Sequence, residues 1–209
     1  MLHQLSPLNS SSLAVTCNDA QRFPDLLDSD GKPFFFDRIL ADVPCSSDGT
    51  VRKTPEILKS WKSTNAFSLH VLQKKILLRG VQLLKKGGRI VYSTCSLNPL
   101  EDEAVVSAVL EQDDTVQLVS VQLDDIGLLA RPGLENWKVF TQEGECDSWD
   151  NLPIKLKKDM YKSLFPSEYV GHHNLNFCRR VLPHLQDTGG FFYAVLEKIK
   201  ETDPKLLRT

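Results

Sequence analysis

The chain has 209 residues, of which 41% are hydrophobic, and this length favours one domain with a buried core over two separate domains. The 25 Lys and Arg residues nearly balance 27 Asp and Glu residues, which excludes the overall positive charge of many nucleic-acid-binding proteins and leaves only a local patch for such contacts. Five cysteines without a Cys-x-x-Cys pair argue against a disulfide framework and against a zinc site, and indicate a reducing compartment.

Two strands are predicted in the first part of the chain. Residues 13–17 form a short apolar run that ends at Asn18 and Asp19, which indicates a strand followed by a turn. Residues 34–43 are almost continuously apolar, as is typical of a strand that is buried on both faces of a parallel sheet, and Pro44 ends this strand.

A helix is predicted over residues 63–84. Its apolar positions recur at spacings of three and four residues: Leu69, Leu72, Ile76, Gly80 and Leu83. This pattern indicates an amphipathic helix on a sheet, with Gly80 allowing a close approach and His70 at the surface. Gly87 and Gly88 are expected to end the helix, and residues 89–94 to form the next strand. Strand, helix and strand together predict a parallel βαβ unit.

A second helix is predicted from Asn98 to about Glu111. Asn98 can cap it, Pro99 suits its first turn, and Glu101 can reach back as in a capping box.

The last two predicted strands cover residues 116–123 and 191–196. The chain is therefore divided into four parts: core at 1–124, an irregular insertion or cover at 125–188, the last core strand at 189–199 and a tail at 200–209. The insertion holds three of the five histidines, His172, His173 and His184.

Two cysteines stand out for their positions. Cys45 and Cys95 each follow a predicted strand, at the edge of the sheet where open α/β proteins place catalytic groups. Because neighbouring strands lie about 4.8 Å apart, we expect the two sulfur atoms within roughly 10 Å of each other in one cleft. The helix that starts after Cys95 favours a thiolate, and the acidic residues 101–103 in its first turn oppose this effect. Cys17 and Cys178 are interpreted as small buried hydrophobic residues.

Asp42 is the polar end of an otherwise apolar run. A carboxylate there costs free energy unless it is hydrogen-bonded or used, so Asp42 is a candidate to bind an ammonium or amino group, with a loop-capping role as the alternative. A thiol redox or acyl-transfer enzyme is a further alternative, which the absence of a Cys-x-x-Cys pair and of a histidine beside either cysteine motif disfavours.

Several short motifs occur together: residues 42–46 (Asp-Val-Pro-Cys-Ser), 48–50 (Asp-Gly-Thr), 52–53 (Arg-Lys), 87–88 (Gly-Gly), 92–96 (Tyr-Ser-Thr-Cys-Ser), and 98–99 (Asn-Pro) with Glu101 and Glu103. This set resembles the Nop/Sun family of RNA cytosine-5 methyltransferases over nearly the whole chain. Residues 48–50, 97–99, 182–184 and 188–192 resemble the eukaryotic tRNA-modifying branch. Ser47 stands where this family has glycine.

The resemblance implies a Rossmann-like class I methyltransferase sheet and a chemistry based on the two thiols. Cys95 would be the nucleophile that adds to C6 of a cytosine, so that C5 accepts a methyl group from S-adenosyl-L-methionine, and Cys45 would assist product release. Asp42 would hold the cofactor or the cytosine amino group, and Asp19 the adenine amine of the cofactor.

The implied partner is RNA, and tRNA in particular, with no metal. The target base must be single-stranded or extruded for a sulfur atom to reach C6. Arg52 and Lys53 are candidates for contacts with the RNA backbone, with solvated surface charge as the alternative. The sequence has no signal-peptide pattern and no run near the roughly 18 apolar residues of a membrane span, so we expect a protein without membrane association, located in the nucleus, its nucleolus or the cytoplasm.

The family's glycine-rich cofactor loop and ribose-binding acid have no counterpart in this sequence. In the implied strand order, 3-2-1-4-5-7-6, the chain would lack the first two strands. We therefore expect residues 13–17 to lack a partner strand, residues 34–43 to form an apolar edge that favours association, and the 209-residue chain to bind no S-adenosyl-L-methionine and methylate no RNA. A catalytically incompetent fragment or an RNA-binding module is the alternative function, against which the presence of both Cys45 and Cys95 argues.

Overall fold

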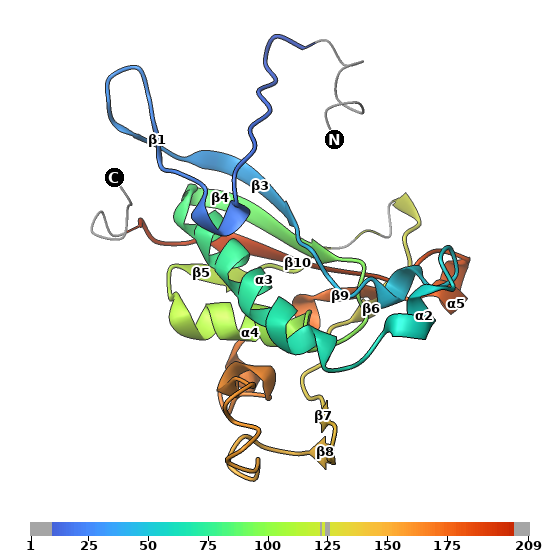
Figure 1. Cartoon of the computed structure of the whole chain (residues 1–209). Helices are drawn as coiled ribbons and strands as arrows, with labels where there is room; N and C mark the ends of the chain where they lie inside the picture. Colours follow the sequence, from blue (N-terminus) through green and yellow to red (C-terminus); the bar gives the residue numbers. More distant parts are fainter. Residues whose placement is uncertain (1–9, 122, 124–125, 203–209) are drawn as a thin grey trace.

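A mixed sheet forms the centre of the structure, a computed structural model that describes residues 10–121, 123 and 126–202. Its strands lie in the following order: β3 (Phe36–Asp42), β4 (Leu84–Thr94), β10 (Phe191–Lys198), β9 (Arg179–Val181) and β6 (Arg131–Pro132). β5 (Val116–Leu118) also pairs with β10. β3 and β4 are parallel and the other pairs are antiparallel (Figure 1). The order β3-β4-β10-β5 corresponds to the 4-5-7-6 half of the implied family sheet.

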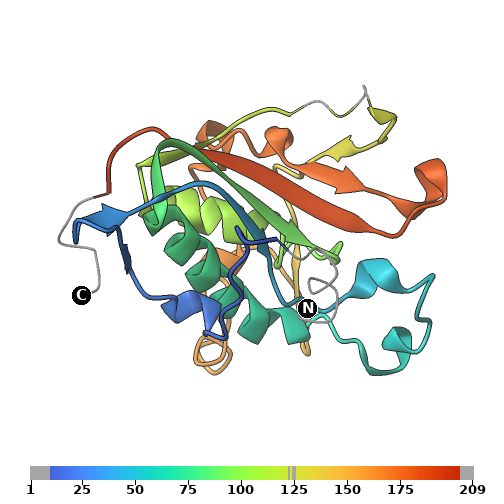
Figure 2. The ribbon, with the colours of Figure 1, turned by 90° about the horizontal axis from the view of Figure 1, so that it is seen from above.

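Two helices cover one face of this sheet. α3 (Asn65–Gln82) and α4 (Glu103–Gln112) lie side by side beneath the strands, as the view from above shows (Figure 2). α3 connects the parallel strands β3 and β4, so the predicted βαβ unit is confirmed. A β-carbon at Gly80 would clash with the Ile90 side chain of β4, which confirms that this glycine permits the close approach of helix and sheet.

The buried stripe of α3 differs from the predicted one. Its buried positions include Ala66, His70, Gln73, Leu77 and Val81, whereas three of the predicted leucine and isoleucine positions are only half-buried. The helix is covered on two sides, by the sheet and by α4, so more than one apolar stripe can be buried. The prediction of a surface His70 is wrong, because this side chain is completely buried.

The end of α3 also differs from the prediction. The helix stops at Gln82, and β4 begins at Leu84, before the glycine pair. Phe36 N donates to Leu83 O at 2.8 Å, which brings this segment into the sheet early. Gly87, with φ 78°, then lies in the irregular stretch where the register between β3 and β4 shifts.

The expectations for the first two strands need correction. Residues 10–19 form no strand and are exposed. The apolar run at 34–43 is divided between β2 (Pro33–Phe34), which pairs with β1 (Leu26–Leu27), and β3. β3 is not buried on both faces: Ala41 is buried, but Leu40 on the opposite face is 70% exposed. β3 pairs only with β4 among the described residues, so it forms the expected edge of the sheet.

The second helix starts later than predicted. Asn98 Oδ1 accepts a hydrogen bond from Leu100 N at 3.1 Å, and Glu101 N donates to Asn98 O at 2.9 Å, so this segment forms a turn. α4 begins at Glu103 after the cap residue Asp102. Glu101 does not complete a capping box, because its side chain binds elsewhere.

The remaining elements are short. β5 ends at Leu118, before the predicted limit at 123, and residue 122 lies outside the described residues, as do residues 203–209 of the predicted tail. β10 is confirmed and lies in the middle of the sheet.

The other elements are η2 (Ala20–Arg22), η3 (Asp48–Thr50), α2 (Ile57–Ser60), the hairpin β7 (Val139–Thr141) and β8 (Gly144–Cys146), η5 (Lys162–Leu164), η6 (Val170–His172), η7 (Leu175–Phe177) and α5 (Pro183–Gln186). Across the part of the chain that the structure describes, no helix has the length and apolar character needed to cross a membrane.

Candidate active site

The two cysteines singled out from the sequence lie in contact. Cys45 follows β3 and Cys95 follows β4, and because these strands are neighbours and parallel, their carboxyl ends open on the same edge of the sheet. The Sγ atoms of Cys45 and Cys95 are 3.2 Å apart, and both residues are partly buried free thiols. The structure thus places both side chains in one site, well within the separation of roughly 10 Å expected from the strand spacing.

This contact shifts the pKa values of the two thiols in opposite directions. The hydrogen bond with Cys45 lowers the pKa of Cys95 to about 6, although burial opposes the shift. The same hydrogen bond raises the pKa of Cys45 far above its ordinary value, and burial adds to the rise. The two sulfur atoms titrate as a coupled pair, and the directions of the two shifts favour loss of the proton from Cys95, with Cys45 as the thiol that donates to it. The pair therefore provides one activated nucleophile and one proton donor.

Ser47 lies beside both sulfur atoms. Its Oγ is 3.4 Å from Cys95 Sγ and 3.8 Å from Cys45 Sγ, and its hydrogen bond also helps to lower the pKa of Cys95. Its backbone is left-handed, with φ 60° and ψ 20°, a conformation that glycine adopts more easily than other residues. The departure from the family's glycine therefore keeps the shape of the loop and adds a hydroxyl group at the thiol pair.

Backbone contacts hold the Cys45 loop against the Cys95 loop and the start of β10. Gly49 N donates to Cys95 O at 2.9 Å, and Gly190 N donates to Gly49 O at 2.7 Å. A β-carbon on Gly49 would lie 2.5 Å from Gly190 O and 2.7 Å from Cys95 O, so only glycine fits there. Asp48 Oδ1 accepts from Leu97 N at 3.0 Å. Gly49 and Gly190, which the sequence indicates only as part of the family resemblance, thus allow the Cys45 loop, the Cys95 loop and the loop before β10 to pack closely.

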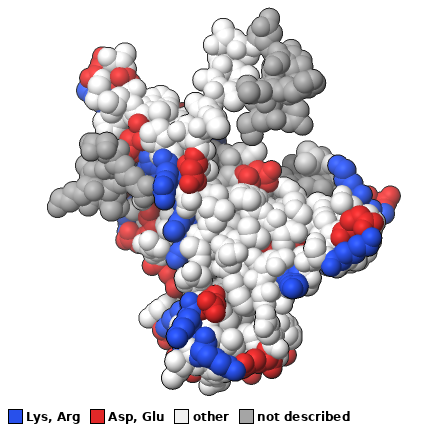
Figure 3. Space-filling view, viewed as in Figure 1, with Lys and Arg blue, Asp and Glu red and all other residues white. Residues whose placement is uncertain are grey.

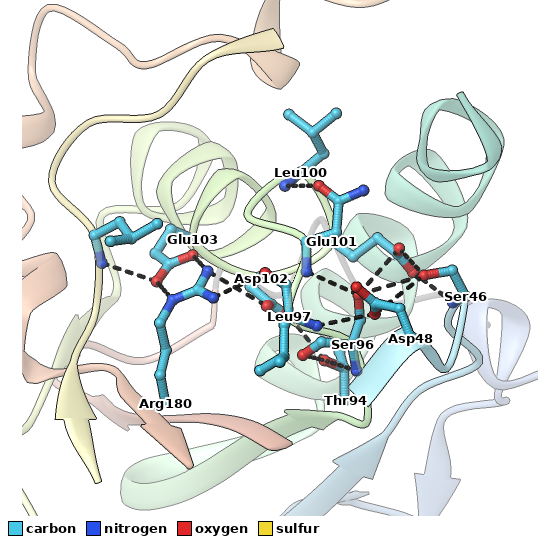
Figure 4. A network of polar contacts seen from close by, with 12 residues as sticks. Ser46, Asp48, Thr94, Ser96, Leu97, Leu100, Glu101, Asp102, Glu103 and Arg180 are labelled. Carbon is cyan, nitrogen blue, oxygen red and sulfur yellow. Dashed lines mark hydrogen bonds and ion pairs between the residues drawn. The ribbon is translucent and has the colours of Figure 1, made fainter. Parts of the chain in front are cut away.

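The acidic triplet 101–103, which ends at the first residue of α4, is completely buried, and each member has hydrogen-bond partners (Figure 4). Glu103 forms an ion pair with Arg180 of β9, and Asp102 Oδ1 accepts from Thr94 Oγ1 at 2.7 Å. Burial, followed by repulsion from Glu103, raises the pKa of Asp102. Glu101 turns instead toward the two cysteine loops. Sequence analysis missed Arg180, because it lies 77 positions from Glu103 and no local pattern marks it.

Asp42 and Asp19 are not brought together. Asp42 ends β3 with an exposed side chain, and its Oδ1 accepts from Ser93 Oγ at 2.9 Å. Asp19 caps η2 and accepts hydrogen bonds from the backbone N–H and side-chain amide of Gln21. η2 packs on α3, whose Arg79 binds the residues that follow η2, and this end of α3 leads to the amino end of β4 (Figure 1). Asp19 and Asp42 thus have different hydrogen-bond partners, Gln21 and Ser93, in the described residues.

The two candidate RNA-binding residues lie on the surface next to the cysteine loops. Arg52 forms an ion pair with Asp187 and donates to Thr188 O at 3.2 Å, so it links the segment after Cys45 to the loop before β10. Its side chain is 50% exposed, and Lys53 is exposed as well.

The other candidate residues lie elsewhere. Cys178 is completely buried, as expected, whereas the prediction of a buried Cys17 is wrong because this residue is exposed. His173 Nδ1 lies 3.0 Å from Ser107 Oγ. Within the described ranges, no group of three or more His, Cys, Asp or Glu residues is arranged to hold a metal ion. A cavity of about 770 Å³ lies between α4 and residues 147–169, and neither Cys45 nor Cys95 lines it.

Comparison with known proteins agrees with these observations. A family model described as 16S rRNA methyltransferase RsmB/F matches residues 1–197. The chain belongs to this methyltransferase family. It is 42% identical over 96% of its length to a tRNA (cytosine(34)-C(5))-methyltransferase of Drosophila melanogaster, and 44% identical over 97% of its length to a multisite-specific tRNA:(cytosine-C(5))-methyltransferase of Saccharomyces cerevisiae. Identity to the 25S rRNA (cytosine-C(5))-methyltransferase nop2 of Schizosaccharomyces pombe is 32%. The resemblance to the eukaryotic tRNA branch of RNA cytosine-5 methyltransferases is thereby confirmed.

The family match extends to solved structures. The structure superposes on the crystal structure of NSun6 from Pyrococcus horikoshii with SFG at a TM-score of 0.62 and 22% sequence identity. The match covers 95% of this chain and 38% of the NSun6 chain. This likeness confirms the Rossmann-like class I methyltransferase fold. The chain spans 28% to 32% of the length of the three eukaryotic tRNA methyltransferases it matches.

Proposed function

We propose that this chain carries the thiol pair of an enzyme that methylates C5 of cytosine in RNA, with tRNA as the substrate. The observation that carries the proposal is the contact of 3.2 Å between Cys45 Sγ and Cys95 Sγ at the carboxyl ends of two parallel strands. A redox or acyl-transfer role would need a histidine or a second thiol motif at this site, and the hydrogen-bond partners of both sulfur atoms are a serine and the other cysteine.

Cys95 is the nucleophile in the proposed reaction. C5 of cytosine is a poor nucleophile until a group adds to C6, and a thiolate with a lowered pKa adds readily at neutral pH. Addition uses up the thiolate that accepts the hydrogen bond of Cys45. Because that hydrogen bond is the main cause of the raised pKa of Cys45, the pKa of Cys45 then falls toward its ordinary value. Cys45 can then lose its own proton to solvent water and take the proton from C5, and the electron pair of the C5–H bond re-forms the C5–C6 double bond as the C6–S bond breaks and Cys95 leaves as a thiolate.

S-Adenosyl-L-methionine is the proposed methyl donor, and when bound it would supply the electrophilic methyl group. Asp42 is the described residue best placed to hold it or the cytosine amino group, because its exposed carboxyl group lies on the strand that leads to Cys45. Asp19 and Asp42 share no hydrogen-bond partner among the described residues. That the 209-residue chain binds no S-adenosyl-L-methionine stays a prediction, which calorimetric titration tests.

RNA is proposed to approach over the surface next to the thiol pair. Arg52 and Lys53 lie there and can contact phosphate groups. The target cytosine must leave its stack to reach Cys95, which is partly buried.

The thiol roles are tested by two substitutions in the longest form of the protein expressed from its gene, with transcribed tRNA and labelled S-adenosyl-L-methionine. Cys95→Ala should abolish methylation and every covalent adduct. Cys45→Ala should trap an RNA–protein adduct that survives denaturing electrophoresis, because release is blocked. An adduct that persists without Cys95, or no adduct in the Cys45 variant, contradicts this assignment.

A further inference from the structure

Glu101 binds the two cysteine loops at once. It lies in the turn between β4 and α4 and is completely buried. Its Oε1 accepts from Ser46 Oγ at 2.5 Å and from Ser96 Oγ at 3.2 Å, and its Oε2 accepts from Ser46 N at 2.8 Å. Ser46 directly follows Cys45 and Ser96 directly follows Cys95. One carboxyl group therefore joins the residues next to both thiols (Figure 4).

Glu101 is itself held in place by the core. Tyr92 Oη donates to Glu101 O at 2.6 Å, which fixes its backbone to β4. Gln73 of α3 donates from Nε2 both to Glu101 Oε2 at 3.1 Å and to Pro44 O at 2.9 Å. The carboxyl group is thus connected to the sheet, to α3 and to both loops, and these elements together leave it little freedom to move.

The contact between the thiols depends on this arrangement. A distance of 3.2 Å between two sulfur atoms on separate loops requires that the loops keep a fixed spacing. Removing the carboxyl group would leave the Ser46 N–H and two hydroxyl groups without their buried acceptor, which costs free energy and lets the loops rearrange.

We propose that Glu101 is a positioning residue of the active site, whose carboxyl group holds the Cys45 and Cys95 loops together so that the two sulfur atoms stay in contact. The inference rests on the proposed function for the reaction that the thiols perform. The thiol contact itself does not depend on RNA or cofactor, so it can be tested on the chain alone.

The experiment compares Glu101→Ala and Glu101→Gln with Glu103→Gln in the 209-residue chain. Glu103 is a matched control, because it is equally buried and two positions away, but it binds Arg180, which reaches the Leu97 carbonyl of the Cys95 loop, and it does not join the two cysteine loops. Glu101→Gln keeps the volume and one acceptor oxygen, so it provides a folded comparison where Glu101→Ala unfolds. Circular dichroism establishes that each variant is folded.

Two readouts report on the thiol pair. The first is the pH midpoint for alkylation of Cys95, followed by peptide mass spectrometry. The second is the rate at which diamide links Cys45 and Cys95, a reaction in which the diazene takes two electrons from the sulfur atoms, the one proton of the pair and one proton from solvent, and becomes a hydrazine. Both Glu101 variants should raise the alkylation midpoint from about 6 and slow disulfide formation by about tenfold, with a smaller change in Glu101→Gln, whereas Glu103→Gln should match the wild type.

Two results would overturn the proposal: folded Glu101 variants with unchanged thiol chemistry, or an equal loss in Glu103→Gln, which would show a general loss of stability. Methyl transfer by the longest expressed form gives a further check, since Glu101→Ala should lower kcat and leave KM for tRNA unchanged. Failure of the proposed function would appear as no methylation in the wild type, and the thiol measurements would still decide the role of Glu101.

Discussion

Ser47 shows how one side chain can combine a backbone cost with a chemical role. A left-handed backbone at a residue other than glycine costs about 1–2 kcal/mol. Ser47 adopts this conformation with φ 60°, and its Oγ lies near both sulfur atoms of the thiol pair. The residue that places a hydroxyl group at the thiol pair thus has a strained backbone, and strained backbone conformations are common in active-site loops.

Two substitutions separate these effects. Ser47→Ala and Ser47→Gly both remove the hydroxyl group, so each should raise the pKa of Cys95, measured by the pH midpoint of its alkylation. Only Ser47→Gly relieves the backbone, so it should unfold with a free energy roughly 0.5–1 kcal/mol higher than Ser47→Ala in denaturant titrations. Equal stabilities would show that the backbone here is not strained, and an unchanged alkylation midpoint would show that the hydroxyl group does not act on Cys95.

The sequence predicts the two cysteines of the thiol pair better than the buried residues Glu101 and Arg180 that hold the surrounding loops. Cys45 and Cys95 could be found because each follows a strongly apolar run, and strand ends in a parallel sheet meet at one edge. Glu101 was assigned to a local cap, and Arg180 carried no signal, because their partners come from segments distant in sequence. The periodicity of a sequence indicates which face of a helix or strand is buried. It does not indicate which buried polar side chains of different elements form hydrogen bonds with each other.

At the scale of elements, His70 joins three segments of the helical layer. The Leu100 carbonyl can only accept, so His70 Nδ1 carries the proton and donates to it at 2.7 Å, and Nε2 accepts from Ser163 Oγ at 2.8 Å. One neutral imidazole thus connects α3, the turn before α4 and η5. Burial lowers the pKa of His70 to about 4.

This shift predicts a loss of stability in acid. Between pH 6.5 and about 4 the unfolded chain binds a proton at His70 that the folded protein excludes, so the stabilising contribution is complete above pH 6.5 and is lost as the pH falls to about 4. The full effect is about 3 kcal/mol in the free energy of unfolding. His70→Gln, which does not titrate, should show a correspondingly smaller fall between pH 7 and 4.5 in denaturant titrations. The same fall in both proteins would assign the acid sensitivity to other groups.

For elements with strong local signals, the sequence predicts the type and the place in the chain, although β4 begins earlier than predicted. α3, β4 and β10 have long apolar patterns and neighbours on both sides, so local pattern and tertiary packing agree. The failures are residues 13–17, whose apolar run finds no strand beside it among the described residues, and the start of α4, where side chains bind across loops instead of capping the helix. Both depend on partners that a single stretch of sequence does not contain.

On the scale of the whole molecule, the sheet has an open edge. β3 pairs with β4 on one side only, within the described part of the chain, and Leu40 on its outer face is 70% exposed. In the view of Figure 3 the middle of the molecule, where α3 and its neighbours lie, is largely uncharged, and Lys, Arg, Asp and Glu lie toward the margins. An unpaired edge strand invites pairing with another chain; the exposed Asp37, Arg38 and Asp42 of β3 oppose such pairing, and the exposed Leu40 favours it.

The 209-residue chain is therefore expected to self-associate through β3, and Leu40→Lys should prevent this, because a charge on an edge strand opposes pairing. Sedimentation velocity over a range of concentrations should show a rising average mass for the wild type and a constant monomer mass for Leu40→Lys. Ile154→Lys is the matched control, because Ile154 is 83% exposed but lies outside the sheet, and it should behave as the wild type does. If Ile154→Lys abolished association equally, general apolar exposure and not the β3 edge would be the cause; a monomeric wild type would show that the edge is protected in solution.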